Sequence, residues 1–383
     1  MKITRGYYKT EIAGVPYLLS YGQEHAQRGI CIQLNHTGSL LWDALCAGAD
    51  EAGMLQVLAD EFAATKEDLP LLREDIRQYK KQLCMLGILT EEEPVAVGAD
   101  APRFFRIGPL TIAYDGAPEL FETYFAPFSC EKTAEATLSF VLRCDRPAHC
   151  KNGTILVRTR ELMICDCGED YGFVFFGDWG IHEMHVRKDG ARAVVYCVPH
   201  YEQAHGEDVF HALRFAFLVA AQQHGIIVVH SASLLYRDRA WLFSGSSGTG
   251  KSTHTALWES CFQTPLLNGD LNAIGIKDGS PVVYGLPWCG TSGIATPRDY
   301  PLGGIVFLRQ AQKNQVQVPS ADAGILLLLQ RLISPSWTQA LCEKNLRLAQ
   351  QVADHTRLFT LACTKEKEAA SVMRKAVDAA LHV

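Results

Sequence analysis

The sequence lacks several features that mark specialised classes of protein. No apolar signal-peptide core follows Met1, and the longest apolar runs, FAFLVAA and GILLLL, are too short to span a bilayer. Positive charge is not in excess, because 42 Asp and Glu outnumber 36 Lys and Arg and the formal net charge is -6. This balance disfavours a general nucleic-acid or anionic-membrane binder. We therefore expect a soluble, cytoplasmic protein with no nucleic acid and no membrane as a partner.

The sequence also lacks the signatures of common metal sites. Its 13 cysteines are scattered, and no second CxC or CxxC motif follows Cys165 and Cys167. We therefore expect reduced core thiols, with a metal site at these two cysteines as the lesser alternative. The HEMH run at 182–185 lacks the HExxH spacing that places two histidines on one helical face. The absence of the HExxH spacing disfavours a zinc protease.

A length of 383 residues predicts two or three domains. The pattern of residues 1–90 predicts three short strands followed by three helices, and the acidic segment 91–102, which contains Pro and Gly, predicts a linker. Residues 103–200 predict a β-rich part of short, mostly antiparallel strands. Residues 201–383 begin with a helix and then mix strands with helices. We expect a mixed fold with α+β and α/β character.

The C-terminal part has a clear order of elements. A helix that stops at Gly225 precedes an apolar strand, a turn and a second strand, which leads into a glycine-rich loop and another helix. Three later runs predict strands, LNAIGIK, SPVVYGL and GGIVFLRQ. The remaining predicted helices cover about 321–333, 336–353 and 364–381.

The glycine-rich loop has the G-x-x-x-x-G-K-[ST] spacing of a phosphate-binding loop between a strand and a helix. Its glycines allow backbone amides to surround phosphate oxygens, and the following helix presents its positive N-terminal end. In this motif Lys251 neutralises the β- and γ-phosphates, and Ser252 binds Mg²⁺. The predicted nucleotide-binding residues are Gly245, Ser246, Ser247, Gly248, Thr249, Gly250, Lys251, Ser252 and Thr253.

Two further residues are candidates for phosphoryl-transfer chemistry. Asp270 follows an apolar run in LLNGDLNAIGI, where a carboxylate at a strand end can hold Mg²⁺ or accept a hydroxyl proton; the alternative is a turn aspartate. Asn272, two residues on, is on the same strand face and can support the metal. His230 ends the strand IIVVH and can interact with the phosphates or with Asp270; the alternative is a hydrogen-bonded strand-end histidine.

These residues resemble a known superfamily. The run VVHSASLLYRDRAWLFSGSSGTGKST, then Asp270, then YGLPWCGTSGI is similar to the HPr kinase/phosphorylase and phosphoenolpyruvate carboxykinase superfamily over about 205–310. The resemblance implies ATP-dependent phosphorylation of a serine hydroxyl on a protein or peptide, with ATP and Mg²⁺ as cofactors. It implies catalytic roles for Asp270, His230 and Lys251, and metal binding by Ser252 and Asp270. The family usually shows two adjacent acids, whereas Leu271 stands here beside Asp270, so the division between base and metal ligand stays open.

The N-terminal unit resembles a second family. Its three strands and three helices, with the runs IQLNHTGSLLWDAL and KKQLCMLGIL, look like a winged-helix-like PqqD-type peptide-recognition domain. In that family a leader peptide adds as a strand to the sheet edge and packs against the third helix. The alternative is an ordinary winged helix-turn-helix, which the acidic balance of this unit disfavours. The peptide-binding residues implied by the resemblance are Ile30, Ile32, Arg73, Arg77 and Tyr79.

Together the two resemblances suggest one activity. We expect a peptide serine or threonine kinase whose partner is a ribosomally synthesised precursor peptide, bound through its leader by the N-terminal domain. The resemblance to HPr kinases also allows a homo-oligomer. The alternatives are a small-molecule or carboxykinase-like phosphotransferase and a nucleotide-sensing peptide chaperone without transfer activity.

Overall fold

The fold is mixed α+β, and its strands form four sheets in the part of the chain that the structure describes. The computed structural model describes residues 2–3, 6–22, 25, 29, 31–90, 95–96, 101–132, 135–144, 153–177, 179–197, 206–246 and 248–381. Among these residues, no helix is both long and apolar enough to cross a membrane.

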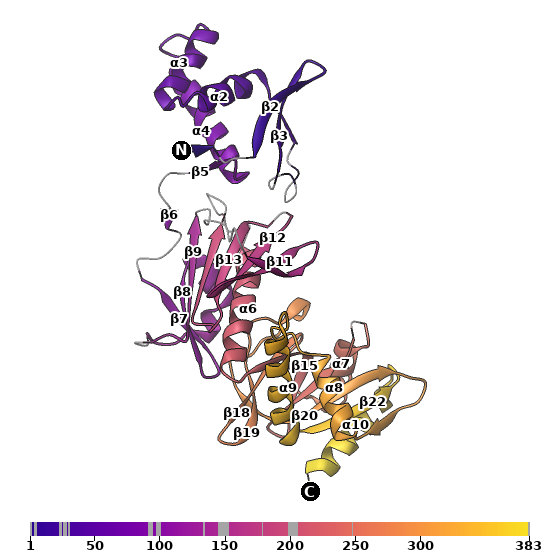
Figure 1. The fold of residues 1–383 in the computed structure, drawn as a ribbon. Coiled ribbons are helices and arrows are strands. Elements are labelled where there is room, and N and C mark those ends of the chain that lie inside the picture. Colours follow the sequence, from indigo (N-terminus) through magenta and orange to yellow (C-terminus); the bar gives the residue numbers. More distant parts are fainter. Residues whose placement is uncertain are drawn as a thin grey trace.

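The N-terminal unit contains the three predicted strands and three predicted helices, together with two short strands, β1 and β5, that were not predicted (Figure 1). Two helices begin at side-chain caps, because Asn35 accepts a hydrogen bond from Gly38 N at 2.7 Å and Asp50 accepts one from Gly53 N at 2.8 Å. Strands β2, β3 and β4 form an antiparallel sheet, while β1 pairs with β5. The elements are β1 (Lys2–Ile3), β2 (Tyr7–Ile12), β3 (Val15–Ser20), β4 (Cys31–Gln33), α2 (His36–Cys46), α3 (Glu51–Glu61), α4 (Leu69–Met85) and β5 (Leu89–Thr90).

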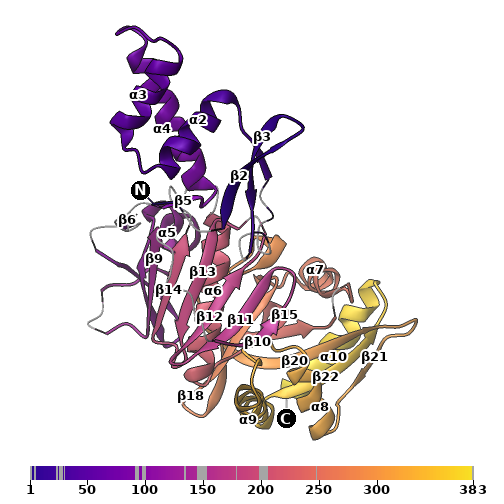
Figure 2. The same ribbon diagram turned by 45° about the horizontal axis from the view of Figure 1, so that its top comes forward.

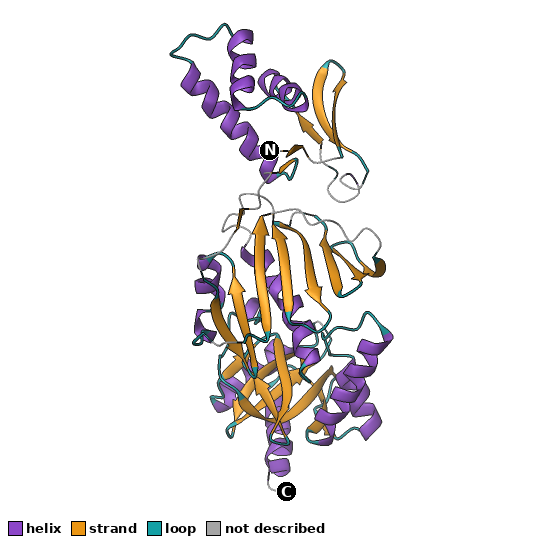
Figure 3. Cartoon of the chain, turned by 60° about the vertical axis from the view of Figure 1, so that its left-hand side comes forward, coloured by secondary structure: helices purple, strands orange, loops and turns teal. Residues whose placement is uncertain are grey.

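The second sheet has the strand order β10-β11-β12-β13-β14-β9-β8-β7, and β6, which lies within the predicted linker 91–102, pairs with β9. Strand β9 pairs in parallel with both β8 and β14. Figure 3 shows these strands side by side in one layer. An unpredicted short helix, α5 (Pro118–Tyr124), lies between β8 and β9. The strands are β6 (Val95–Ala96), β7 (Arg103–Ile107), β8 (Leu110–Asp115), β9 (Leu138–Cys144), β10 (Thr154–Arg158), β11 (Leu162–Cys167), β12 (Asp170–Phe175), β13 (Ile181–Arg187) and β14 (Arg192–Cys197).

Helix α6 (Gly206–Gln223) connects the second sheet to the third. It packs against β9, β13 and β14 of the second sheet and against β15 (Ile227–Tyr236) of the third, and Figures 1 and 2 show it between them. Its buried residues belong to one apolar cluster that includes side chains from both sheets. A helix that is buried on opposite sides is apolar nearly all round, as the run FHALRFAFLVAA is. The second and third sheets therefore share one hydrophobic core.

The third sheet is organised around a long strand, β15, that lies between β18 and β16. Residues 227–230 of β15 pair with β18 on one side, and residues 231–236 pair with β16 on the other. Strand β20 likewise pairs first with β19 and then with β16 and β22, which closes a ring of strands. The remaining elements are β16 (Arg239–Ser244), α7 (Lys251–Phe262), β17 (Leu266–Asn268), β18 (Leu271–Lys277), β19 (Ser280–Tyr284), β20 (Tyr300–Gln310), β21 (Gln315–Gln317), α8 (Ala321–Leu329), α9 (Gln339–Asp354), β22 (Arg357–Cys363) and α10 (Lys367–Leu381).

The C-terminal helices are confirmed, although all three are shorter than predicted. Helix α8 ends at Leu329 because the chain that follows hydrogen-bonds to β15 in an extended form. The prediction also omitted β22, which pairs with β20 on one side and with β21 on the other. Buried Phe359, Leu361 and Cys363 alternate along it with partly buried Thr360 and Ala362.

The cysteines differ in part from the prediction. Among the described residues, ten cysteines are free thiols, and Cys165 is one of the buried ones. Cys167 is disulfide-bonded, so the prediction of reduced thiols is wrong at this position. It lies at the partly exposed end of β11, where another thiol can approach it. The two cysteines therefore do not offer a pair of thiolates to a metal ion.

A glycine on the second sheet offers a test of the packing of α6. Gly190 has φ +78°, and a Cβ atom there would lie 2.4 Å from Ala220 Cα on α6; Gly279 has φ +75° with open space around it. We expect Gly279→Ala to lower the free energy of unfolding by about 1 kcal/mol through backbone strain alone. Gly190→Ala adds an overlap that costs about 1–3 kcal/mol more. Urea denaturation of both variants measures the difference, and equal losses would contradict the described contact.

Candidate functional site

The candidate site lies beside the middle of β15, where the ladder with β18 on one side ends and the ladder with β16 on the other side begins. His230 pairs with Leu271 at the end of the β15–β18 ladder, and the next residue, Ser231, pairs with Ser244 at the end of β16. The phosphate loop leaves β16 directly after Ser244, and Asp270 immediately precedes β18. The structure therefore brings together the three segments that carry the predicted catalytic and phosphate-binding residues.

The phosphate loop has the backbone that its glycines predict. Gly248 and Gly250 have φ values of +77° and +100°, which are costly for other residues. A Cβ atom on Gly245 would lie 2.4 Å from the hydroxyl oxygen of Thr249. Gln310 on β20 donates from Nε2 to the Gly248 carbonyl at 2.9 Å and holds the outer part of the loop. Ser247 lies outside the described residues.

Lys251, Ser252 and Thr253 form the first turn of α7. Lys251 Nζ donates across the loop to the Gly245 carbonyl at 3.3 Å. Burial lowers the pKa of Lys251 and the positive charge of Arg331 lowers it further, while Asp270 opposes both effects. Ser252 and Thr253 are exposed at the positive end of the helix. This turn can thus bind an anion and offer a hydroxyl to a cation.

Asp270 and His230 contact each other directly. His230 Nδ1 lies 3.1 Å from Asp270 Oδ1, and both side chains are about one-third exposed. The hydrogen bond from His230 lowers the pKa of Asp270, as do the charges of Arg214 and Lys251, whereas burial opposes them. Asp270 is therefore ionised at neutral pH, and its carboxylate can bind a cation or accept a proton.

Asn268 holds Asp270 in place. This buried side chain accepts hydrogen bonds from Asp270 N at 2.9 Å and Leu271 N at 3.1 Å. It also donates to the carbonyls of Leu286 and Trp288, each at 3.2 Å, in the loop that follows β19. The same loop brings Gly290 so close that a Cβ atom there would lie 2.9 Å from Asp270 Cβ. The loop and Asp270 therefore form one rigid arrangement.

The structure corrects the predicted role of Asn272. Asn272 is 2 % exposed, and its amide nitrogen donates to Ser231 O at 2.6 Å and to Ser231 Oγ at 3.0 Å. Its amide therefore stabilises β15 at Ser231, because the buried Asn272 side chain points into the sheet and away from the phosphate loop.

No acid flanks Asp270 on either side. Leu271 is 3 % exposed and belongs to the hydrophobic core. On the other side, a Cβ atom on Gly269 would lie 2.2 Å from Ser292 Oγ, so no side chain fits there without rearrangement. Within the described ranges, no group of three or more His, Cys, Asp or Glu side chains is gathered for a metal ion. A Mg²⁺ ion here would rely on Ser252, Asp270, phosphate oxygens and water.

Two arginines near the site were not predicted from the sequence. Arg214 on α6 is half-buried; burial lowers its pKa, and the charge of Asp270 raises it. Arg331 accepts a hydrogen bond on its carbonyl from His230 N at 2.8 Å. Both lie far from the phosphate loop in sequence and belong to no spacing motif, so only the fold reveals their proximity.

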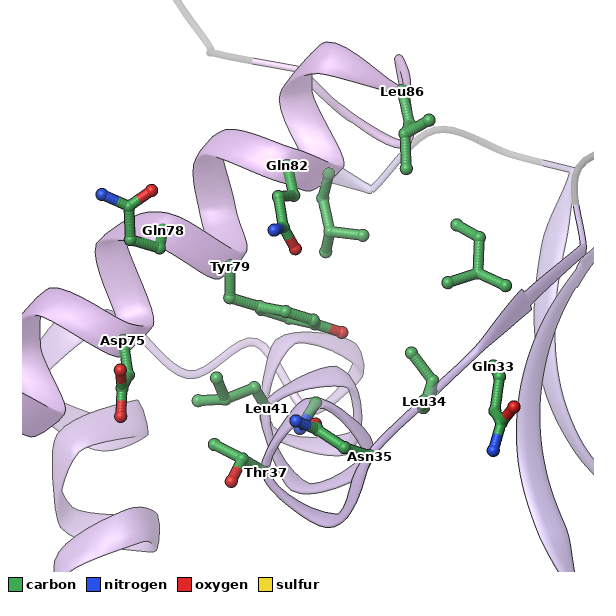
Figure 4. A pocket seen from close by; sticks show the side chains of 13 residues that line it. Gln33, Leu34, Asn35, Thr37, Leu41, Asp75, Gln78, Tyr79, Gln82 and Leu86 are labelled. Carbon is green, nitrogen blue, oxygen red and sulfur yellow. The ribbon is translucent and has the colours of Figure 1, made fainter.

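A second candidate site is a cleft in the N-terminal unit (Figure 4). Among the described residues β4 pairs only with β3, so its other edge faces α4 across a cavity of about 390 Å³. Tyr79 extends its ring from α4 into this cavity, and its hydroxyl is buried without a hydrogen-bond partner among the described residues. Burial raises the pKa of Tyr79. The lining includes Ile32, Leu34, Asp75, Tyr79, Gln82 and Leu86.

The peptide-binding residues predicted from the sequence are only partly brought together. Ile32 and Tyr79 line the cleft from opposite sides. Arg73 and Arg77 do not line it, because they lie on another face of α4; both are exposed, and Arg77 pairs with Glu74 at 2.8 Å. Ile30 lies outside the described residues.

Comparison with known proteins assigns no family to the chain. No family model matches the sequence, and no curated protein matches it. The proposals that follow therefore depend on the residues and their geometry.

The hydrogen bonds of Asn268 predict a large effect on stability. Asn268→Ala leaves the buried Asp270 and Leu271 amides without their acceptor, which costs about 2–4 kcal/mol. Asn314→Ala is a matched control, because Asn314 accepts one hydrogen bond, from Thr364 N at 2.8 Å, far from the site. We expect it to cost about 1 kcal/mol. Chemical denaturation compares the variants, and a loss at Asn268 no larger than at Asn314 would show that Asn268 does not hold this arrangement.

Proposed function

We propose that the protein is an ATP-dependent kinase that phosphorylates a serine or threonine hydroxyl of a ribosomally synthesised precursor peptide. The observation that carries the proposal is the convergence of a phosphate loop at a helix N-terminus with the paired side chains of Asp270 and His230. A loop of this kind holds phosphates but does not define a reaction. An ionised carboxylate beside it supplies the group that phosphoryl transfer to a hydroxyl requires.

The residues present fit a nucleotide and a divalent cation. Positive-φ glycines free the loop amides for phosphate oxygens, and Lys251 provides a positive charge within the loop. Ser252 and Asp270 are the proposed Mg²⁺ ligands. When bound, Mg²⁺ neutralises charge on the phosphates. These features support ATP as the phosphoryl donor.

The proposed transfer step uses Asp270 as the base. The acceptor hydroxyl gives its proton to the Asp270 carboxylate as its oxygen bonds to the γ-phosphorus and the bond from that phosphorus to the β–γ bridging oxygen breaks. His230 orients the carboxylate through the 3.1 Å contact and keeps it ionised. Because Leu271 is buried and Gly269 has no room for a side chain, we assign both the base and the metal-ligand role to Asp270.

The N-terminal cleft supports a peptide as the acceptor. The open edge of β4 offers backbone groups to an added strand, and the cavity beside α4 offers space for its side chains. We propose that the leader binds there in the PqqD manner. A tethered core peptide then has a high local concentration at the kinase site, so that site needs little sequence recognition.

The first prediction concerns the base. Full-length protein with Mg²⁺, γ-labelled ATP and the precursor peptide encoded beside its gene should label the peptide. Asp270→Asn should lower the rate at least about a hundredfold while leaving nucleotide binding measurable, because a neutral amide cannot accept the proton. Asp278→Asn is the control, since Asp278 is an exposed turn residue. Label on a metabolite, nucleotide binding without transfer, or undiminished transfer by Asp270→Asn would overturn the proposal.

The second prediction concerns the cleft. Tyr79→Phe removes the buried hydroxyl that has no partner in the described part of the free protein. If the leader supplies its acceptor, fluorescence anisotropy with labelled leader should report about threefold to tenfold weaker binding, the value of one hydrogen bond. Arg77→Ala, which changes another face of α4, should leave the affinity unchanged. Weaker binding by Arg77→Ala together with unchanged binding by Tyr79→Phe would place the peptide outside this cleft.

A further inference from the structure

Trp288 holds one face of α6 against the loop that follows β19. Its ring contacts those of Phe210 and Phe217 on α6, with centroids 5.8 Å and 5.1 Å away, and its Nε1 donates to the Phe210 carbonyl at 2.9 Å. Residues 210, 214 and 217 share one helix face, because they are four and three positions apart. Arg214 therefore lies on the face of α6 that meets this loop.

The same loop places Arg214 near the catalytic carboxylate. The Trp288 carbonyl accepts a hydrogen bond from Asn268 Nδ2 at 3.2 Å, and Asn268 Oδ1 accepts one from Asp270 N at 2.9 Å. Trp288 and Asn268 thus connect α6 to Asp270. The electrostatics agree, because the hydrogen bond from His230 lowers the pKa of Asp270 and the charge of Arg214 lowers it further.

The guanidinium of Arg214 is left without a counter-ion. Its half-buried side chain makes no hydrogen bond or ion pair with any described residue, and Cζ lies 5.6 Å from the ring centroid of the neighbouring Phe215. His211, three residues earlier on α6, has a buried Nδ1 atom that also lacks a described partner. A half-buried cation is costly alone and becomes favourable when an anion pairs with it.

The charges around Asp270 show on which side Arg214 lies. Arg214 and Lys251 both lower the pKa of Asp270, after the larger effect of the His230 hydrogen bond. The pKa of Lys251 responds to burial, Asp270 and Arg331, whereas that of Arg214 responds to burial and Asp270. Arg214 therefore lies on the side of Asp270 away from the phosphate loop. Because the acceptor and leaving oxygens are in line across the γ-phosphorus, that side belongs to the acceptor.

We propose that Arg214 binds a carboxylate of the acceptor peptide, beside the hydroxyl that is phosphorylated. The inference rests on the proposed function and names what the transfer site recognises in its acceptor. A guanidinium binds a carboxylate through two parallel hydrogen bonds, which fix both the position and the orientation of the core peptide. The carboxylate belongs to an Asp or Glu side chain near the acceptor or to the peptide C-terminus. Arg214 stays protonated, because the hydroxyl proton passes to Asp270.

The test compares three acceptor peptides that share one leader. The first has the core encoded beside the gene, the second has Asn and Gln in place of the Asp and Glu of that core, and the third has an amidated C-terminus. Transfer is measured with full-length protein at saturating peptide, Mg²⁺ and γ-labelled ATP, because the leader sets the affinity of the whole peptide. Arg214→Gln should slow transfer to the encoded core about tenfold to a hundredfold, as expected for a charge-assisted pair. Arg347→Gln, at an exposed arginine of α9, should leave the rate unchanged.

The modified peptides identify the carboxylate. With wild-type protein, the peptide that lacks the bound carboxylate should react as slowly as the encoded core does with Arg214→Gln, and the variant should slow it no further. Arg214→Lys should recover part of the rate, because it keeps the charge without the planar fork. Equal losses with all three peptides would mean that Arg214 acts only through Asp270. That result, or an unchanged rate, would overturn the assignment.

Two binding measurements separate this role from the others. In Arg214→Gln the affinity for a non-hydrolysable ATP analogue, measured by isothermal titration, should change less than about twofold, which also shows that the site is folded. The affinity for labelled leader should not change. A loss of analogue affinity as large as the loss of rate would assign Arg214 to the nucleotide and overturn the inference. Wild-type protein that labels none of the peptides would overturn the proposed function itself, which is a distinguishable result.

Discussion

The arrangement of strands on the two sides of β15 is the constraint on which the candidate site depends. β18 pairs with the first residues of β15 on one side, and β16 pairs with its later residues on the other side. The phosphate loop follows the end of β16 and Asp270 immediately precedes β18, so both lie beside His230 and Ser231, and the segment carrying Arg331 pairs with the first half of β15 on the side away from β18. Buried polar groups, chiefly Asn268 and Asn272, hydrogen-bond to backbone atoms at these strand ends.

The electrostatics of the site follow from this arrangement. Cationic side chains from three separate elements approach one carboxylate, and each is partly removed from water. Gathering these cations raises the free energy of the free protein, and binding a polyanion lowers it. The cluster of cations is therefore suited to binding a ligand and less suited to stabilising the fold. The N-terminal cleft has a different character, because it combines an open strand edge with one buried hydroxyl that has no described partner.

Local signals predicted much of the site. The glycines of the phosphate loop predicted a backbone whose amides are free to surround phosphate oxygens, and Gly248 and Gly250 have the positive φ values that glycine adopts without strain. Helix caps and apolar periodicity also predicted α2, α3 and α4. Position alone singled out Asp270 and His230, and the structure places them 3.1 Å apart. Asn272 was assigned to the metal because strand alternation does not reveal which face is buried.

The sequence by itself determined the phosphate loop, the order of most elements and the short list of reactive side chains, because those depend on residues close together in the chain. Only the tertiary structure decided the pairing of β22, the hydrogen bonds from Asn268 to the loop after β19, and the approach of Arg214 to Asp270 and of Arg331 to Lys251. These depend on contacts between segments separated by many residues. These contacts form because α6 packs in one hydrophobic core with two sheets, and a local sequence pattern cannot predict them.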